Sequence, residues 1–384
     1  MEDFKLDALV VGCGLSGSVI ARFLAEEKNK RVAIWDRRKH IGGNMYDYED
    51  NNGILVHQYG PHTFHTKKKF LYDYMCKYAK WQEFKLTCGA VINSQFTPTP
   101  FNFQTIDDFY SAEEAADLKA RIKKVFGERE TATVVEVLNC KDEKVRAYAQ
   151  FLFVNDYSLY TAKQWGVSAS EIDPSILKRV PLRFSYDTGY FDDEYQVMPK
   201  ESYTKFFEKL LDHPNIEVKL GIEALEHLQI TNDKILIDGE DLNIPIIYTG
   251  ALDELFGLSE GKLPYRSLRF EWKYENIESK QDAPVVAYPQ ADGYTRITEY
   301  KKLPIQKVKG TTYAVEYPLK YDEKSNMEPY YPVLTEKSQE IYTKYKAKAD
   351  KVKNLYCAGR LADFKYYNMD QALERALELC EKLN

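Results

Sequence analysis

The sequence lacks the features that mark secreted, zinc-dependent and membrane proteins. Its six cysteines include no C-x-x-C pair, and its six histidines show no H-E-x-x-H spacing. We therefore expect no disulfides, no metal site and no zinc catalysis. No apolar run approaches the roughly 18–20 residues that span a bilayer. Acidic residues precede the first apolar run and glycines interrupt it, so we expect no secretory signal and a reducing, cytoplasmic location.

The chain also lacks an excess of positive charge. Its formal net charge of −6 argues against nucleic acid or an anionic membrane as the main partner. A length of 384 residues is long for one compact unit, which favours two intimately packed domains. Tyrosine is abundant, with 30 residues. This abundance is either a compositional bias or the mark of a site that contacts a sugar and a base through rings with polar tips.

A glycine-rich turn near the start predicts a dinucleotide site. In "LDALVVGCGLSGSVIARFLAEE" a buried-strand run leads into Gly12, Gly14 and Gly17 and then into an amphipathic helical stretch. Gly12 permits the tight turn, Gly14 lets the backbone approach a pyrophosphate, and Gly17 lets helix and strand pack closely. A second strand, "RVAIWD", ends at Asp36, where a carboxylate would bind ribose hydroxyls. A coincidental strand–turn–helix is the alternative.

Two further segments favour FAD over NAD as the dinucleotide. The glycine pair Gly42-Gly43 follows Asp36 closely, where small residues would let the chain turn under a pyrophosphate. Near the C-terminus, "NLYCAGR" reads as a strand, and Asn368 with Gln371 reads as the N-cap of an amphipathic helix. The start of that helix would stabilise negative charge on a reduced flavin. An ordinary loop and an ordinary terminal helix remain the alternatives.

The middle of the chain predicts an insertion into the nucleotide-binding fold. Hydrophobic spacing predicts helices over 70–84, 107–127 and 142–165. Alternating aromatic and polar residues predict half-exposed sheet over 180–199. We therefore expect an α/β fold in which a discontinuous FAD-binding Rossmann-like domain carries an inserted helical domain and an antiparallel β-sheet domain. The expected boundaries are 1–68, 214–262 and 345–384 for the FAD-binding domain, 69–170 for the mainly helical substrate-capping domain, and 171–213 and 263–344 for the sheet domain.

Nine motifs carry a resemblance to a known family. They are "GCGLSG", "DRRKHIGGN", "YGPHTFHT", "YTAKQWG", "SILKRVPLRF", "YFDDEYQVMP", "YTRITEYK", "PYYP" and "CAGRLADFKYYNMD". In this order and at these spacings, the chain resembles the prokaryotic UDP-galactopyranose mutases along nearly its whole length. The resemblance implies an isomerase that interconverts UDP-galactopyranose and UDP-galactofuranose for cell wall or surface polysaccharide. It also implies that the protein is a flavoprotein that forms a homodimer.

In such a mutase the cofactor would act without net redox. The resemblance implies FAD that is active when reduced, with a reductant such as NAD(P)H. N5 of the reduced flavin attacks the anomeric carbon and expels UDP, and a flavin–sugar iminium lets the ring reclose. This is covalent catalysis in which the protein supplies orientation and electrostatics.

The resemblance also implies which residues act on the substrate. Tyr160 would stack on the uracil, and Arg179 and Arg296 would hold the diphosphate, since planar guanidinium groups match its dense charge. His62 would contact the N5 region, where a His with a near-neutral pKa could adjust protonation. The catalytic residues expected from the resemblance are Arg179, Arg296 and His62. The expected substrate-binding residues are Asp156, Tyr157, Tyr160, Thr161, Trp165, Arg179, Tyr190, Arg296, Tyr331, Tyr366 and Asn368.

A further set would bind the cofactor. These residues are Gly12, Gly14, Leu15, Ser16, Gly17, Asp36, Arg37, Gly43, Asn44, His62, Val218, Gly359, Arg360, Asn368 and Met369. A loop near residues 180–195 is expected to cover the substrate.

Four departures from the family pattern leave the exact sugar open. They are Leu86, Tyr157, Ala287 and Asn368. UDP-N-acetylgalactosamine or a dTDP-6-deoxyhexose is therefore an alternative substrate. An amine-oxidase-type flavoenzyme, which needs an apolar channel, and a noncatalytic nucleotide-binding module are alternatives of other classes.

Overall fold

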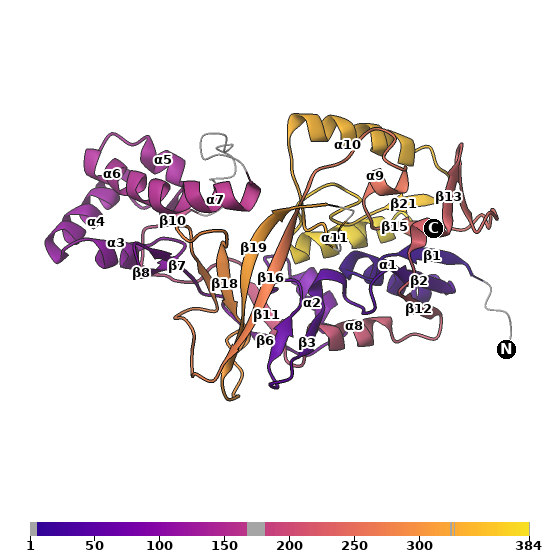
Figure 1. Cartoon of the computed structure of the whole chain (residues 1–384), viewed down its shortest axis with the longest axis horizontal. Coiled ribbons are helices and arrows are strands. Elements are labelled where there is room, and N and C mark those ends of the chain that lie inside the picture. The colour runs from indigo at the N-terminus through magenta and orange to yellow at the C-terminus, as the bar shows by residue number, and fades with distance from the viewer. Residues whose placement is uncertain (1–5, 167–180, 323–324, 326, 384) are drawn as a thin grey trace.

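A computed structural model gives the structure of residues 6–166, 181–322, 325 and 327–383. The molecule is elongated, with a helical lobe at one end and a sheet-and-helix lobe, which contains both termini, at the other (Figure 1). Long strands lie between the two lobes. Arg179, one of the two arginines expected at the diphosphate, lies outside the described residues.

A five-stranded parallel sheet forms the centre of the larger lobe. Its strands come from three distant parts of the chain and lie in the order β12-β2-β1-β15-β21. Their bounds are β1 Ala8–Val11, β2 Val32–Asp36, β12 Ile216–Leu220, β15 Ile246–Tyr248 and β21 Leu355–Cys357. Because parallel strands are covered on both faces, they read as nearly continuous apolar runs. The expectation of a nucleotide fold rebuilt from separate segments agrees with this sheet.

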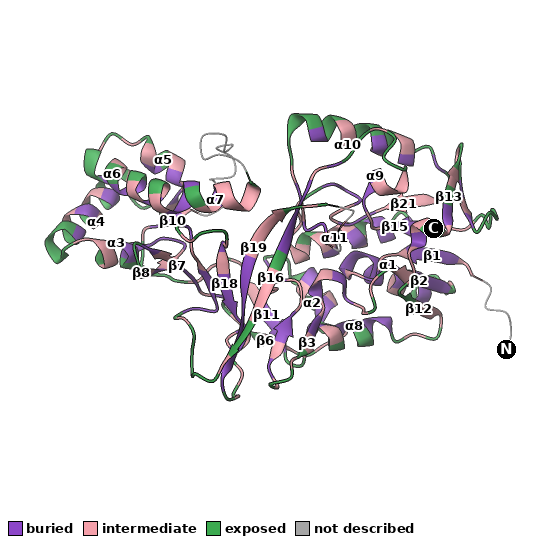
Figure 2. Ribbon diagram, viewed as in Figure 1, coloured by how far each residue is buried: buried purple, intermediate pink, exposed green. Residues whose placement is uncertain are grey.

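Helices cover this sheet through apolar faces. Helices α1 (Leu15–Glu26) and α11 (Met369–Cys380) pack against each other, and α8 (Tyr203–Leu211) packs on α1. In α11, Leu373, Ala376 and Cys380 form a buried stripe at helical spacing. Figure 2 shows buried residues concentrated in α1 and the neighbouring strands, whereas α10 (Glu336–Ala349) exposes much of its surface.

The predicted N-cap of α11 is confirmed at Asn368. Its backbone is extended, and its N–H donates a hydrogen bond of 2.9 Å to Gln371 Oε1. This bond is the half of a capping box in which the side chain at the third helical position reaches back to the cap.

A mostly antiparallel sheet of seven strands links the two ends of the molecule. The order is β20-β16-β19-β18-β17-β7-β8, and only β17 with β7 is parallel. The bounds are β7 Cys88–Ile92, β8 Gln95–Thr99, β16 Tyr265–Glu275, β17 Val285–Ala287, β18 Arg296–Glu299, β19 Thr311–Lys320 and β20 Tyr331–Pro332. The long β16–β19 pair extends from the helical lobe's side toward the nucleotide lobe (Figure 1).

The helical lobe has an apolar core of its own. Its elements are α3 Phe103–Phe109, α4 Ala112–Phe126, α5 Val134–Leu138, α6 Glu143–Leu152, a π-helical turn Phe153–Tyr157 and α7 Ser158–Trp165. Ser111 and Thr133 begin α4 and α5 with capping boxes to Glu114 and Glu136. A separate buried cluster, which includes Leu118, fills the space between these helices. A core of its own is the mark of a domain.

Several sequence expectations need correction. The helix expected over 70–84 is only α2, Lys69–Cys76, because residues 81–83 form β6 and pair with β11 (Tyr195–Pro199). Strands β7 and β8 lie within the range expected to be mainly helical, yet they belong to the seven-stranded sheet. Over 181–199, the described part of the range expected to be sheet, the strands are β10 (Leu182–Arg183) and β11.

Two helices also depart from the expected sheet domain. Helix α8 lies in a range expected for that domain but packs on α1, and α10, which begins in such a range and ends beyond it, packs on α9 (Leu252–Leu255). Local periodicity shows which face of an element is apolar, but not which distant element covers it. The exact division into three domains stays a proposal.

Among the residues that the structure describes, no helix is both long and apolar enough to cross a bilayer.

Candidate active site

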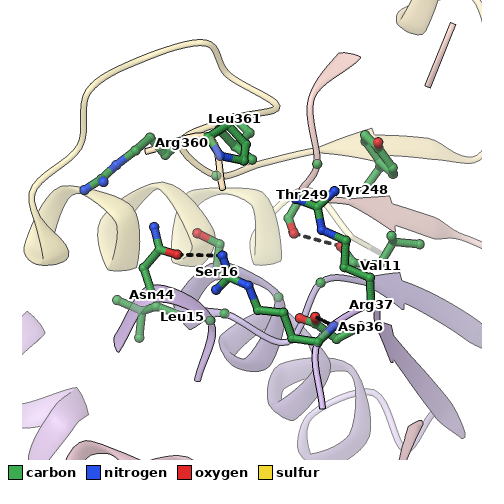
Figure 3. A pocket seen from close by; sticks show the side chains of 18 of the residues that line it. Val11, Leu15, Ser16, Asp36, Arg37, Asn44, Tyr248, Thr249, Arg360 and Leu361 are labelled. Carbon is green, nitrogen blue, oxygen red and sulfur yellow. Dashed lines mark hydrogen bonds between the residues drawn. The ribbon is translucent and has the colours of Figure 1, made fainter. Parts of the chain in front are cut away.

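A cavity lies where the parallel strands end. Figure 3 shows side chains from three chain segments around it, with Asp36 and Arg37 at the end of β2, Thr249 after β15 and Arg360 after β21. In open α/β sheets the carboxyl ends of the strands are the place where ligands bind. The topology thus brings segments that are far apart in sequence to one site.

Three glycines at this cavity are required by close contacts. A methyl group at Gly12, whose φ is +105°, would lie 2.0 Å from Thr249 Oγ1. At Gly17 it would lie 2.0 Å from the Gly12 carbonyl oxygen, and at Gly43 2.8 Å from Gly14 Cα. These contacts hold the two glycine-rich turns against each other, which leaves backbone rather than side chains at the cavity wall. Such a cradle fits a dinucleotide pyrophosphate.

Asp36 is held by two backbone N–H groups. Cys13 donates to Oδ2 at 2.7 Å and Arg38 donates to Oδ1 at 2.8 Å. Because each carboxylate oxygen has a second lone pair, both can still accept a ribose hydroxyl. Asp36 is therefore suited to binding a ribose hydroxyl, as the sequence predicted.

An ion-pair cluster closes one side of the cavity. Arg37 Nη2 and Arg38 Nη2 lie 3.0 Å and 2.8 Å from the same oxygen of Glu328, and Arg38 also donates to Asn44 Oδ1 at 2.9 Å. Although burial opposes ionisation, the hydrogen bond and charge of Arg38 lower the pKa of Glu328. Sequence reasoning missed Arg38 and Glu328. Arg38 stands in the quoted "DRR" motif, whereas nothing near Glu328 in sequence points to this partner.

Most residues expected at the cofactor line this one cavity. They are Gly12, Gly14, Leu15, Ser16, Gly17, Asp36, Arg37, Gly43, Asn44, His62, Gly359, Arg360, Asn368 and Met369. Val218 is absent from the lining, because it lies within β12 beside Ile34, and residues 222–225 just after β12 line the cavity instead. Thr249, Gly250, Glu254 and Tyr367 also line it and were not expected.

His62 is held rigidly beside the cavity. Its N–H donates to His57 Nδ1 at 3.0 Å, and its carbonyl accepts from the Tyr203 hydroxyl at 3.2 Å. Its ring Nδ1 lies 2.8 Å from the Gly60 carbonyl oxygen. Because a carbonyl only accepts, Nδ1 carries the proton and Nε2 keeps its lone pair. His57 is fully buried and orients the His62 backbone.

The near-neutral pKa expected for His62 is wrong. Burial, with a smaller contribution from His57, lowers the pKa of His62 to about 3. The ring is therefore neutral at physiological pH and can accept a hydrogen bond at Nε2.

Arg296 begins β18 and is anchored by a buried carboxylate. Its Nε and Nη2 each lie 2.8 Å from Glu316 Oε2, and the two residues are direct cross-strand partners. Glu316 is 1% exposed, and its other oxygen has no hydrogen-bond partner among the described residues. The pair fixes the guanidinium in position. Sequence reasoning missed Glu316 because it lies on the next strand.

Tyrosines surround this arginine. The rings of Tyr331 and Tyr366 stack with centroids 5.6 Å apart. The guanidinium of Arg360 lies 5.7 Å and 5.1 Å from their centroids, which joins them to the cofactor cavity. Burial raises the pKa of Tyr160 and of Tyr331, and the charge of Arg296 opposes both shifts. Both hydroxyls are therefore protonated donors near Arg296.

The remaining expected substrate residues lie on or near α7. Asp156 and Tyr157 are buried in the π-helical turn before α7, Thr161 is buried one turn later, and Trp165 ends the helix. π-helical turns often occur at functional sites. Burial raises the pKa of Asp156 to about 7, and the charge of Lys163 opposes this shift. Tyr190 comes from another segment, and the charges of Tyr190 and Asp156 both act on Tyr160.

Comparisons with known proteins identify the family. A family model described as UDP-galactopyranose mutase matches residues 155–366, and a model described as an NAD(P)-binding Rossmann-like domain matches residues 10–77. A UDP-galactopyranose mutase of Mycoplasma pneumoniae is 32% identical over 99% of this chain and 96% of its own. The chain belongs to the UDP-galactopyranose mutase family. A dTDP-fucopyranose mutase of Escherichia coli is 35% identical over 97% of each chain.

Solved structures share the fold of this UDP-galactopyranose mutase family member. A reduced UDP-galactopyranose mutase has a TM-score of 0.72 at 14% identity and covers 98% of this chain and 93% of its own. A putative protoporphyrinogen oxidase from Exiguobacterium has a TM-score of 0.61 at 13% identity, with 98% of each chain covered. These likenesses confirm the predicted α/β fold class.

The four departures from the family pattern lie at or near the site. Asn368 lines the cofactor cavity. Ala287 is the direct cross-strand partner of Arg296, and the Leu86 carbonyl accepts from the Tyr190 N–H at 2.8 Å. Tyr157 packs edge-on against Phe101. The small side chain of Ala287 leaves this flank of Arg296 without a polar group of its own.

Proposed function

We propose that the protein interconverts UDP-galactopyranose and UDP-galactofuranose with FAD as a cofactor that is active when reduced. One observation carries the proposal: the anchored Arg296 and the tyrosine pair lie beside the dinucleotide cavity. Arg360 and His62 line that cavity. Arg360 faces Tyr331 and Tyr366, and the charge of Arg296 acts on His62. A nucleotide sugar held at Arg296 would therefore have its reacting carbon next to the cofactor.

When bound, reduced FAD would supply a nucleophilic nitrogen at the anomeric carbon. The residues fit this task. Arg296 would hold the departing diphosphate, whose charge grows as its bond to the sugar breaks. Arg179 shares this role by its motif. His62 would accept a hydrogen bond through Nε2 without adding a positive charge.

Other side chains would bind and orient the substrate. Tyr160 would stack on the base, and Tyr190, Tyr331 and Tyr366 would donate hydrogen bonds to the diphosphate. Thr161, Trp165, Asp156 and Tyr157 would line the nucleoside and sugar. Asn368 would contact both cofactor and sugar at the start of α11.

A related nucleotide sugar is the second candidate. The dTDP-fucopyranose mutase of Escherichia coli is as similar to this chain as the UDP-galactopyranose mutases are. Ala287, beside Arg296, supports this candidate because it removes a polar contact expected next to the substrate. UDP-N-acetylgalactosamine remains a further candidate. An amine oxidase is less well supported, since a buried arginine and paired tyrosines suit a diphosphate rather than an apolar amine.

The test is a substrate panel with the reduced holoenzyme. UDP-galactofuranose, UDP-N-acetylgalactofuranose and dTDP-fucofuranose are incubated with dithionite-bleached protein, and the products are separated by chromatography. Conversion of UDP-galactofuranose at the highest kcat/KM supports the main proposal, and preference for dTDP-fucofuranose supports the second candidate. Steady oxygen consumption with an amine, and no conversion of any sugar, would overturn both.

We also propose a cytoplasmic homodimer that NAD(P)H reduces and that feeds cell wall or surface polysaccharide synthesis. Light scattering of the purified protein tests the dimer, and flavin bleaching by NADPH under nitrogen tests the reductant.

A further inference from the structure

Lys163 is half-buried, and its ammonium group sits in a cage of backbone carbonyls. Its Nζ donates to the carbonyl oxygens of Tyr288 at 2.7 Å, Ala291 at 2.9 Å and Tyr294 at 2.7 Å. An ammonium group has three N–H donors and no acceptor, so the cage uses all of them. A lysine beside Trp165 in the "YTAKQWG" motif therefore does not point into solvent. It joins α7 to the turn between β17 and β18.

The two segments that Lys163 joins carry opposite ends of the proposed substrate site. Helix α7 carries Tyr160 and Thr161, which would hold the nucleoside. The caged turn, residues 288–294, is separated from Arg296 by one residue. A shift of the turn relative to α7 would therefore change the distance between the nucleoside face and Arg296.

A second cation holds the same helix from the opposite direction. Arg266 on β16 donates from Nε to the Gln164 carbonyl at 3.0 Å and from Nη2 to the Lys163 carbonyl at 3.3 Å. The last carbonyls of a helix have no partners within the helix, and cations stabilise that end. Arg266 thus fixes the end of α7, whereas Lys163 reaches the turn before Arg296.

We propose that Lys163 is a positioning residue that sets the spacing between the nucleoside-holding face of α7 and the diphosphate-holding Arg296. The inference rests on the proposed function, because it assigns these two faces to one nucleotide sugar. Lys163 itself does not touch the substrate. Its effect is on how well both ends of the ligand are held at once.

The carbonyl cage around Lys163 should make the spacing between α7 and Arg296 depend on pH. A neutral amine has two N–H donors, so deprotonation leaves one of the three carbonyls without its partner. Burial lowers the pKa of Lys163 to about 8, and the charges of Asp156 and Asp292 oppose this shift. Asp156 faces Lys163 from the π-helical turn, Asp292 from the caged turn, and Arg266 from β16. The affinity for a nucleoside diphosphate should therefore fall as the pH rises through 8.

The test measures UDP binding by calorimetry to the oxidised FAD holoenzyme. Lys163→Met should raise the Kd of UDP about tenfold at pH 7, as expected for losing charge-assisted hydrogen bonds. Its FAD content should stay that of the wild type. Lys144→Met is the matched control, because Lys144 is exposed on α6 and pairs with Asp117 on the surface. Between pH 7 and 9 the wild type and Lys144→Met should lose affinity together, and Lys163→Met should lose less.

Combining Lys163→Met with Arg296→Ala distinguishes a role of Lys163 in positioning from a role in stabilising the fold. In Arg296→Ala the effect of Lys163→Met on UDP affinity should shrink, because the spacing to Arg296 no longer matters. Should Lys163→Met fail to fold, Lys163→Arg keeps a permanent charge and should bind UDP without the loss near pH 8.

Two outcomes would overturn the inference. The first is UDP binding by Lys163→Met within about twofold of Lys144→Met while only its melting temperature falls. The second is an undiminished effect in the Arg296→Ala background. If the wild type converts nucleotide sugars in either case, only the role of Lys163 fails. If the wild type neither binds UDP or dTDP nor converts their sugars, the proposed function fails with it.

Discussion

The cofactor cavity and the proposed substrate cleft, meaning the residues around Arg296, are built in different ways. At its glycine-rich turns the cavity wall is backbone, held close by glycines such as Gly12 and Gly17 that have no room for a side chain. The cleft is made of charged and aromatic side chains, and its arginine is held by an ion pair to Glu316. Steric fit therefore fixes the first region, and electrostatic pairing fixes the second.

This difference has a chemical reason. A cofactor that stays bound needs a rigid surface that matches its shape. A leaving diphosphate needs positive charge that strengthens its contacts in the transition state. Substitutions that add volume should therefore damage the cavity, and substitutions that remove charge should damage the cleft.

Arg296→Ala is the strongest test of this comparison. Removing the guanidinium should lower kcat by about 10²–10³-fold, the usual cost of losing one electrostatic stabiliser of a transition state. FAD should stay bound, since Arg296 does not line the cofactor cavity. Single-turnover kinetics of the reduced enzyme and the flavin absorbance of the same sample measure both. Turnover at the wild-type rate would remove the diphosphate assignment.

The second test breaks the ion pair from its other side. Glu316→Ala leaves a half-buried Arg296 without its carboxylate partner, which should cost about 1.5–3 kcal/mol of folding free energy, the usual worth of a hydrogen bond to a charged group. Urea unfolding of the holoenzyme measures this loss. Glu271→Ala is the control, because Glu271 makes its ion pair on the exposed part of β16 and should leave the unfolding midpoint nearly unchanged. Equal losses in the two variants would mean that the Glu316 pair contributes little.

The comparison also explains which parts could be predicted from the sequence. Gly12, Gly17 and Asn368 were found because turns and helix caps depend on a few adjacent residues. Glu316 and Glu328 were missed because their partners come from other strands and loops. Register and long-range pairing leave no local pattern in a single sequence.

The burial of a side chain and its bonds to backbone groups could not be predicted from the sequence either. The near-neutral pKa expected of His62 failed because burial by distant residues lowers it. The partners of Lys163 are backbone carbonyl groups, which every residue carries, so no sequence pattern marks them. The helix expected over 70–84 ended early because pairing with β11 makes residues 81–83 a strand.

Alanine substitutions at Gly17 and Gly14 test the role of steric fit at the cofactor cavity. Gly17→Ala would place a methyl group 2.0 Å from the Gly12 carbonyl oxygen and should cost about 1–3 kcal/mol of stability, because backbone must move. Gly14→Ala meets its nearest atom at 3.8 Å and should fold normally. Because Gly14 lines the cavity, its added methyl should instead weaken FAD binding. Thermal unfolding and FAD content of the two variants give the comparison, and identical behaviour would contradict it.

Asp156→Asn gives the most pH-specific effect. Burial raises the pKa of Asp156 to about 7, so the folded protein binds its proton more tightly than the unfolded chain does. Stability therefore falls as the pH rises from about 4 to 7, and the full penalty is present above 7. The amide carries no charge and escapes this penalty, so Asp156→Asn should be more stable than the wild type at pH 8, by at most the roughly 4 kcal/mol that raising the pKa to about 7 represents. At pH 4 the two should unfold alike. A difference that is independent of pH would mean that Asp156 is ionised throughout, and that this cleft tolerates an isolated negative charge close to where a diphosphate would bind.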